Sequence, residues 1–396
     1  MKLRADTLLI KLQFLTLVGI IVTQALGQAQ VSSLLFTLTF ALTFGLWLVT
    51  AARKISRRNG LAILILIASC AGVSANALMT GTVVSFSYFK KLIMFWSTVL
   101  LLGVMGEYRP EGPEIRFIFR WNSLLACFWI LLYFGWRDRM HLLNGLVTVY
   151  LTFGFTNPNL TAVFLSAVCM IELIHGAAAV KRMEKLRHTV QAGWMLFFVF
   201  ETRARNAQLL LVFFLTAYLI LTFFPSRKPR MNGWMAAVVT MFPFLFAMGY
   251  LLLVHSPVIQ KLFSFLIGEG KELDSRIGIW QFALSAFASS PVFGAYSEIS
   301  GGTGASQMHN SHLDILASYG APVFGMFCVF LFQVLHGGDA QGGGHIHFLC
   351  QAGLAALLLS GMGEAMLFSG GMGIYLFTGV FLMLTNFDFP NEGPLP

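Results

Sequence analysis

Residues 306–335 read SQMHNSHLDILASYGAPVFGMFCVFLFQVL, a cluster of polar side chains that runs directly into membrane-type residues. His309, Asn310 and His312 lie in the cluster, and Asp314 follows them. Buried polar groups of this kind are costly in a bilayer unless they are paired or used. The stretch therefore predicts a membrane-spanning helix that begins at a functional site.

The composition extends this prediction to the whole chain. Of its 396 residues, 57% are hydrophobic and only 11% are charged. Apolar runs of about 20 residues, the length that crosses a bilayer as a helix, recur along the sequence. The sequence predicts an all-α polytopic membrane protein, a single integral membrane domain over residues 1–396, with twelve spans at 8–26, 33–51, 61–79, 88–106, 119–135, 160–179, 189–201, 207–224, 234–254, 313–334, 348–364 and 370–386.

The basic residues indicate how the spans are oriented. The net charge of +9 comes from 26 Lys and Arg against 17 Asp and Glu, and the basic residues gather in short clusters such as 53–58, 181–187 and 227–230. Basic clusters between apolar runs are typical of cytoplasmic loops, and they favour a topology with both termini in the cytoplasm. No zinc-ligand spacing, basic helix or aromatic platform accompanies them, which argues against a nucleic-acid partner.

In this topology the unusual polar residues gather on the non-cytoplasmic side. Two long segments face outward: 136–159 and 255–312, the latter a large loop between spans nine and ten with interfacial helices. Arg203 and Arg205, at the break between spans seven and eight, face outward as well. That side of the membrane has no ATP and no nucleotide sugars, so a reaction there needs an activated substrate delivered on a lipid.

His309 is the first candidate for chemistry. An imidazole titrates near neutral pH and can accept a proton from a hydroxyl, which makes His309 a candidate general base for attack by a sugar alcohol. The alternative is structural: Asn310 or Ser311 caps a helix at the interface, and the histidines are merely hydrated.

Arg276 is a candidate phosphate ligand. It precedes the amphipathic stretch IGIWQFALSAFASSPVFG in the outer loop. A guanidinium is always charged and offers forked donors that match phosphate oxygens. An ion pair with Asp274 or Glu272, or anchoring to lipid headgroups, is the alternative.

Four further cations lie at the outer ends of spans. Arg203 and Arg205 at a break between two spans are costly unless they line a polar cavity or bind an anion. Lys90 and Lys91 lie near the outer end of the fourth span. For all four residues, the alternative is that the long side chain reaches out to the headgroups.

Three motifs resemble those of the O-antigen ligase/polymerase superfamily of bacterial envelope proteins. TRARNA at 202–207 is similar to the family's TxSRGA and aligns its arginine with Arg205. The family's R…W…P…G pattern resembles Arg276, Trp280, Pro291 and Gly294, and its HN…L…G pattern resembles His309, Asn310, Leu313 and Gly320. FTNPN at 155–159 also resembles the segment that precedes a span in many members.

The match has local departures. Ala204 and Asn206 replace the serine and glycine of SRG, and His312 stands where an aromatic residue is common. Ser318 stands where an acidic residue often precedes the glycine, and Val323 replaces a frequent second glycine. The histidine and both arginines of the motifs are kept.

The resemblance implies the architecture of a lipid-dependent, C-type glycosyltransferase and a reaction without metal, nucleotide or other cofactor. A glycan on undecaprenyl pyrophosphate is the donor, and a sugar hydroxyl is the acceptor. His309 is then the base, while Arg205 and Arg276 hold the pyrophosphate and stabilise its charge as it leaves. Substrate contacts are expected from Arg203, Lys90, Lys91, Asn310 and His312, and in-line attack implies inversion at the anomeric carbon.

Several functions remain open. A polymerase, the preferred reading, extends one lipid-linked repeat chain with another in the bacterial inner membrane, with its active site on the non-cytoplasmic face and a chain-length regulator as a possible partner. A ligase instead moves the polymer onto lipid A-core. A flippase for lipid-linked oligosaccharide is the third reading, but transporters of this size usually show related halves, and the sequence shows no repeat.

Overall fold

The computed structural model describes residues 5–51, 56–82, 86–136, 141–144, 148–155, 157–224, 231–253, 256–258, 261, 271–296, 308–336, 344–363 and 374–389. Part of the outer loop expected over 255–312 therefore lies outside the described residues. So do the side chains of Glu272 and Asp274, the candidate partners of Arg276.

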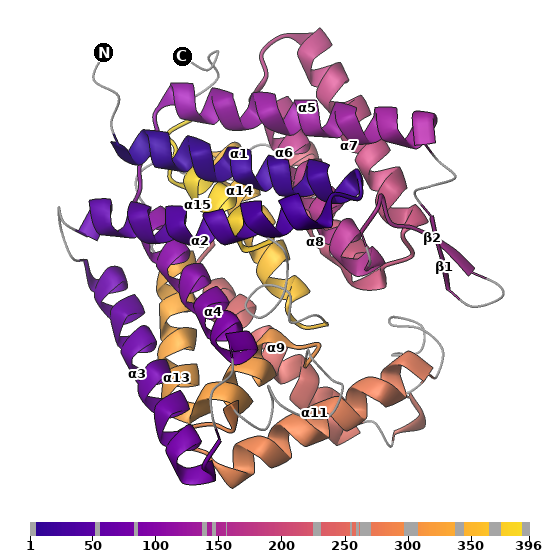
Figure 1. Cartoon of the computed structure of the whole chain (residues 1–396). Coiled ribbons are helices and arrows are strands. Elements are labelled where there is room, and N and C mark those ends of the chain that lie inside the picture. Colours follow the sequence, from indigo (N-terminus) through magenta and orange to yellow (C-terminus); the bar gives the residue numbers. More distant parts are fainter. Residues whose placement is uncertain are drawn as a thin grey trace.

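The regular structure of the described chain is helical apart from one short hairpin (Figure 1). The helices are α1 (Ala5–Ala25), α2 (Ala29–Ala51), α3 (Arg57–Thr80), α4 (Phe86–Met105), α5 (Gly112–Trp136), α6 (Pro158–Ala178), α7 (Arg182–Glu201), α8 (Arg205–Phe223), α9 (Gly233–Leu253), α11 (Lys271–Ser289), α13 (Ser311–His336), α14 (His345–Ser360) and α15 (Ile374–Thr385). Strands β1 (His141–Asn144) and β2 (Thr148–Leu151) pair antiparallel within residues 136–159, a hairpin that the sequence does not predict.

Most of these helices suit a membrane. Among the described helices, α1, α2, α3, α5, α6, α8, α9 and α13, eight in all, are long and apolar enough to cross one, and α14 and α15 are apolar but shorter. Of the twelve expected spans, eight overlap one of these candidate helices, and the other four overlap α4, α7, α14 and α15. Leu78, Leu131 and Phe223 are 85%, 72% and 71% exposed, which suits side chains that contact lipid. The chain is a polytopic α-helical membrane protein.

α7 begins earlier than the sequence predicts. The expected span starts at residue 189, whereas the helix starts at Arg182 and includes most of the charged cluster 181–187. His188 and Gln191 in its first turns are buried, and α7 packs along α6. Tertiary contacts supply most of the stability of helices in proteins, so this packing keeps the polar start helical.

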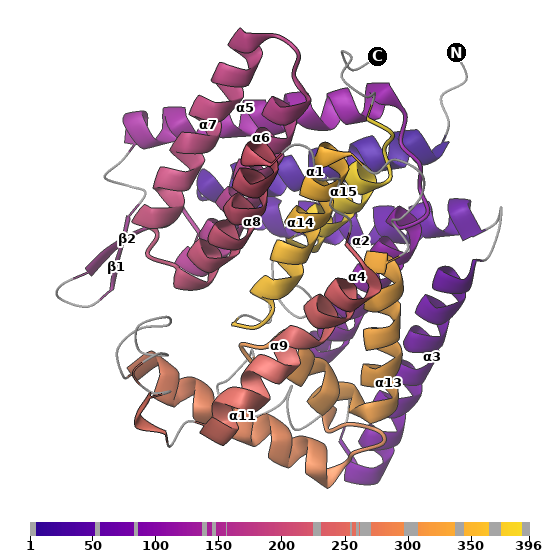
Figure 2. The same cartoon turned by 180° about the vertical axis from the view of Figure 1, so that it is seen from behind.

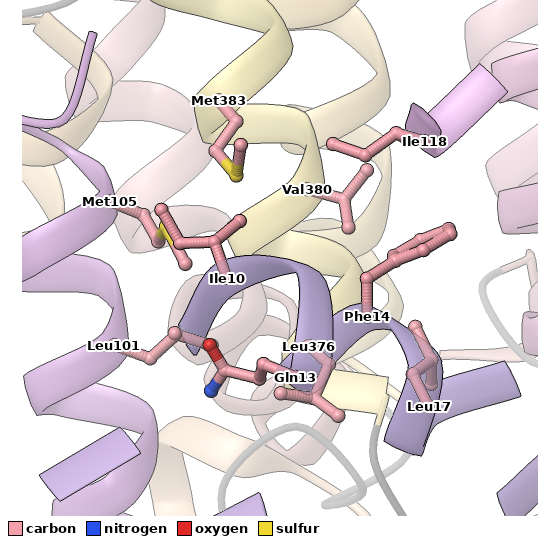
Figure 3. A pocket seen from close by; sticks show the side chains of 10 residues that line it. All are labelled: Ile10, Gln13, Phe14, Leu17, Leu101, Met105, Ile118, Leu376, Val380 and Met383. Carbon is pink, nitrogen blue, oxygen red and sulfur yellow. The ribbon is translucent and has the colours of Figure 1, made fainter. Parts of the chain in front are cut away.

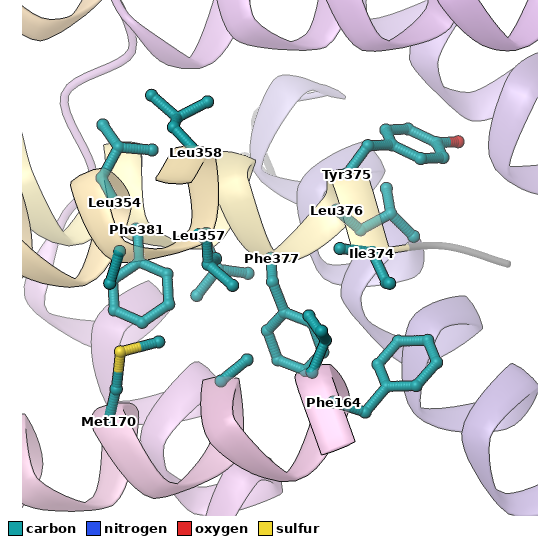
Figure 4. Close-up of a cluster of buried hydrophobic side chains, with 14 of the residues drawn as sticks. Phe164, Met170, Leu354, Leu357, Leu358, Ile374, Tyr375, Leu376, Phe377 and Phe381 are labelled. Atoms are coloured by element: carbon teal, nitrogen blue, oxygen red, sulfur yellow. The ribbon is translucent and has the colours of Figure 1, made fainter. Parts of the chain in front are cut away.

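α6 is the most buried of the candidate spans, with 89% of its apolar window enclosed. α5, α7, α8, α14 and α15 pack around it. Asn157 caps its start by accepting a hydrogen bond from the backbone two residues on, at 2.8 Å. Figure 4 shows its apolar contact with α14 and α15, where the rings of Phe164 and Phe377 lie 5.9 Å apart. The core of the bundle is therefore built around α6.

The start of α1 and the end of α15 meet at Tyr108, in the turn between α4 and α5. Its hydroxyl lies 3.4 Å from Thr7 Oγ1 and donates to Glu114 Oε1 at 2.6 Å, while its carbonyl accepts a hydrogen bond from Asn386 Nδ2 at 3.2 Å. Burial, and then the bond to Glu114, raise the pKa of Tyr108. The start of α1 and the end of α15 thus lie at one end of the bundle, as Figures 1 and 2 show.

A second, smaller core joins α9, α11 and α13. Its buried side chains include Tyr250, Trp280 and Leu313, and Figure 2 shows α11 lying across the ends of α9 and α13. α13 is kinked at Gly320, where φ is +81° and ψ is 173°, and Pro322 follows. The kink and the crossing helix set the geometry of the candidate site.

Candidate functional site

Asn310 fixes the start of α13. Its Oδ1 accepts hydrogen bonds from the backbone N–H groups of His312 and Leu313, each at 3.0 Å, which caps the helix. Its Nδ2 donates to the carbonyls of Pro243 at 2.8 Å and Met362 at 3.1 Å. The capping interpretation is confirmed for Asn310, whose buried side chain has its hydrogen-bonding capacity occupied by the protein itself.

The turn after α14 joins the start of α8 to the start of α13. The Ser311 N–H donates to the Gly361 carbonyl at 2.9 Å, and Asn206 Nδ2 donates to the Ser360 carbonyl at 2.8 Å. Arg205 directly precedes Asn206, and its side chain is exposed. Two consecutive carbonyls therefore connect the TRARNA motif to the start of α13.

Trp280 connects the helix that holds Arg276 to the segment that holds His309. Trp280 Nε1 donates to the Met308 carbonyl at 3.1 Å, directly before His309. Arg276 lies one turn earlier on α11, on the same side of the helix as Trp280, and is partly exposed. The buried indole thus ties α11 to the histidine segment.

Two glycines lock the loop after α11 onto the kink of α13. The Ala321 N–H donates to the Pro291 carbonyl at 2.8 Å. Gly294 and Gly320 have φ of +76° and +81°, and a Cβ on either would collide with backbone atoms of the opposite segment. Only glycine allows this approach, which explains why both motifs end in that residue.

Arg203 and His309 share an uncommon backbone conformation. Their φ values are +56° and +47°, and Phe153 is the one other non-glycine residue of the described chain with positive φ. Such conformations cost about 1–3 kcal/mol and cluster at functional sites. Arg203 is exposed and His309 is partly exposed, so the surrounding structure holds both side chains at accessible positions.

The two neighbouring lysines of α4 point to different helices. Lys91 Nζ lies 2.7 Å from Asp314 Oδ1, with side chains 13% and 3% exposed. Lys90 Nζ lies over the Phe36 ring of α2, 5.9 Å from its centroid. The structure therefore brings Lys91 to the first turns of α13 as the partner of Asp314, and directs Lys90 toward α2.

The sequence does not predict that Asp314 is the partner of Lys91 at this site. The signal was present, since an acidic side chain within a span needs a partner. The partner itself could not be found, because 223 residues separate the two in the chain.

His312 lies in the core, unlike His309. Its ring is buried and meets Phe324 and Phe327 edge to face, with centroids 6.0 and 5.9 Å away. Within the described residues neither ring nitrogen makes a hydrogen bond of good geometry, although the Thr240 backbone lies beside the ring. The structure thus separates His312 from the accessible candidate residues.

A cavity between α1, α4, α5 and α15 lies apart from these motifs. Figure 3 shows its lining of apolar side chains, with Gln13 as the polar exception. Its volume is about 20 Å³, which holds little more than one water molecule. Gln13 Nε2 donates to Thr43 Oγ1 at 2.7 Å. The volume is too small for a sugar or a pyrophosphate, so this cavity does not fit the proposed substrate.

Comparison with known proteins adds no assignment. No protein-family model matches the chain, and no curated protein is significantly similar to it.

Proposed function

We propose that the chain is a bacterial cell-surface polysaccharide polymerase, which transfers a glycan from undecaprenyl pyrophosphate onto a sugar hydroxyl of another lipid-linked repeat unit. The observation that carries the proposal is the convergence of three distant segments on the start of α13. Asn206 bonds to Ser360 beside the Gly361–Ser311 contact, and Trp280 bonds to Met308. These segments hold Arg205, Arg276 and His309.

Each residue has a role that its chemistry suits. His309 takes the proton of the acceptor hydroxyl, whose oxygen forms the new bond to the anomeric carbon. The bond from that carbon to the pyrophosphate oxygen breaks on the opposite face, so the configuration inverts. Arg205 and Arg276 balance the negative charge of the departing pyrophosphate. Arg203 lies beside Arg205 in the break between α7 and α8 and contacts the same substrate.

Lys91 supports the site from α4 and does not contact the substrate. Paired with Asp314, it holds the first turns of α13 against α4. Asn310 likewise acts on position, since it ties these turns to α9 and to the turn after α14. In this proposal the two residues orient His309 and do not touch the reacting atoms.

The polymerase is preferred to a ligase because of Asn206. The ligase-like SRG pattern has glycine there, whereas the amide of Asn206 makes a hydrogen bond that glycine could not make. We place the enzyme in the inner membrane, with both termini cytoplasmic and the site on the outer face, as the basic clusters favour. A chain-length regulator would act on this outer face.

The test uses purified protein in lipid nanodiscs supplied with undecaprenyl-pyrophosphate-linked repeat units, with and without lipid A-core. We expect a ladder of longer lipid-linked chains without core. His309→Ala should reduce its formation about a thousandfold, within the range of general base catalysis. His345→Ala, on α14, is the matched control and should keep the ladder.

The other outcomes assign the other functions. Products that appear only when core is added would make the protein a ligase. No product in either lane, together with movement of the lipid-linked substrate between leaflets, would make it a flippase. A full ladder from His309→Ala would remove His309 as the base.

A further inference from the structure

A second polar cluster lies far from the candidate site. Glu172 and His175 on α6 and His188 on α7 each offer one ligand atom, and these atoms all lie within 4.8 Å of one another. Glu172 and His175 are three residues apart and so share a helix face. His188 lies about 20 Å along α7 from the helix end at Glu201, at 1.5 Å per residue, and Arg203 follows that end, so the cluster is independent of the proposed transfer reaction.

One oxygen of the Glu172 carboxylate is held by α5. Asn122 Nδ2 and Ser123 Oγ donate to Oε1 at 2.8 and 2.9 Å. Glu172 is fully buried, and these bonds orient the carboxylate so that Oε2 points to the histidines. Partners of this kind commonly fix the orientation of a metal-binding carboxylate.

His188 is hydrogen-bonded to the other oxygen of the Glu172 carboxylate. Its Nδ1 lies 2.7 Å from Glu172 Oε2, and its Nε2 lies 3.1 Å from a terminal nitrogen of Arg187. Arginine can only donate, so Nε2 accepts and the proton of the ring is on Nδ1. That proton therefore lies between Oε2 and Nδ1, where a cation would bind both atoms.

His175 completes the cluster without sharing these bonds. Its ring stacks on Phe119 at 4.2 Å and lies 3.8 Å from the His188 ring, between centroids. Its Nδ1 is buried and has no hydrogen-bond partner among the residues that the structure describes. This nitrogen is therefore available to a cation that enters the cluster.

We propose that Glu172, His175 and His188 bind a divalent transition-metal ion of the zinc type. Two imidazoles and one carboxylate suit zinc, with a water in the fourth position, and the nitrogen ligands disfavour magnesium and calcium. On binding, the His188 proton moves from Nδ1 to Nε2, and no net proton is released. Arg187, which is exposed, then turns from Nε2 into water.

A metal there would clamp α6 to α7 at the end of the bundle opposite Arg203. The proposal adds no step to glycan transfer. The two can therefore fail separately, because the metal is measured by binding and the transfer by product.

The test is a zinc titration of the detergent-purified chain in competition with a chromophoric chelator, repeated with cobalt to record its visible absorption bands. His175→Phe is the informative variant, since phenylalanine keeps the stacking on Phe119 and removes the ligand nitrogen. His345→Phe is the matched control. We expect one zinc ion per chain, bound at least tenfold more weakly by His175→Phe and unchanged in the control.

Two results would overturn the proposal. One is equal zinc affinity and identical cobalt spectra in the wild type and His175→Phe. The other is the absence of stoichiometric zinc in the wild type. Unaltered glycan transfer by a His175→Phe protein that has lost zinc is the expected result, and it would leave the proposed function intact.

Discussion

The start of α13 and the cluster of Glu172, His175 and His188 with its α5 partners, the α5–α7 cluster, both bring polar groups into an apolar protein, but the two regions hold these groups in opposite ways. At the start of α13, Asn310 is bonded to backbone groups of three segments, while His309 stays partly exposed on a strained backbone. In the α5–α7 cluster the buried side chains bond to one another, and Glu172 has no exposed surface.

This difference is the one expected if, as we propose, the start of α13 receives a substrate and the α5–α7 cluster holds a resident ion. A substrate needs accessible reactive groups, so the fold must hold them through their neighbours. A resident ion or a structural contact needs no access, and burial then strengthens each bond. The following substitutions test whether the α13 region depends on its neighbours in this way.

The largest effect is expected from Gly320→Ala. The φ and ψ of Gly320 lie in a region open essentially only to glycine, and the new Cβ would collide with the Val292 carbonyl. We expect a loss of about 4 kcal/mol in unfolding free energy, measured as a lowered thermal midpoint in detergent. Gly325→Ala, where a Cβ meets open space in the same helix, is the control. Equal thermal midpoints for the two variants would show that the close backbone approach at Gly320 does not require glycine.

A smaller loss is expected from Asp314→Asn. It leaves Lys91 buried without its anion, which costs about 3 kcal/mol in unfolding free energy when a buried pair loses one partner. The exposed pair of Lys181 and Glu184, 3.8 Å apart, provides the comparison, and Glu184→Gln should cost less than about 0.5 kcal/mol.

The double variant Lys91→Met with Asp314→Leu tests whether the loss in unfolding free energy comes from the unpaired charge of Lys91 or from the lost contact between the two side chains. It should recover much of the stability, because an apolar pair replaces the ions. An Asp314→Asn protein as stable as the wild type would show that the ion pair does not hold α13 in place.

The smallest of the three effects is expected from Arg276→Lys, which should slow glycan transfer about tenfold with little change in stability. Lysine keeps the charge but cannot make forked contacts with pyrophosphate. Arg182→Lys, on the exposed start of α7, is the matched control in the same nanodisc assay. Equal rates of glycan transfer for Arg276→Lys and the wild type would indicate that Arg276 only anchors α11 to lipid headgroups and does not bind the pyrophosphate.

The sequence predicts the helices well because apolar runs carry the signal. It leaves open whether Asn310 binds substrate or whether Asn310 or Ser311 caps the helix, and the structure shows the cap on Asn310. It does not predict the β1–β2 hairpin, since four-residue strands leave too short a pattern. The early start of α7 is missed because packing on α6 outweighs its polar composition.

The long-range contacts of both regions are beyond the sequence. Lys91 with Asp314, Asn206 with Ser360, and Trp280 with Met308 join residues that only the packing of helices makes neighbours. For the α5–α7 cluster the hint was Glu172, an acidic residue inside an apolar span. Its histidine partner lies on the next helix, so spacing along one helix could not reveal it.

Photoaffinity labelling with a photoreactive undecaprenyl pyrophosphate analogue in nanodiscs, followed by mass spectrometry of the labelled peptides, tests most directly whether the three segments form one site. We expect labels near Arg203–Arg205, on α11 near Arg276 and around His309, all removed by excess unlabelled undecaprenyl pyrophosphate. Labels confined to other spans, or labels at these positions that the unlabelled lipid cannot displace, would contradict the claim that the three segments form one site.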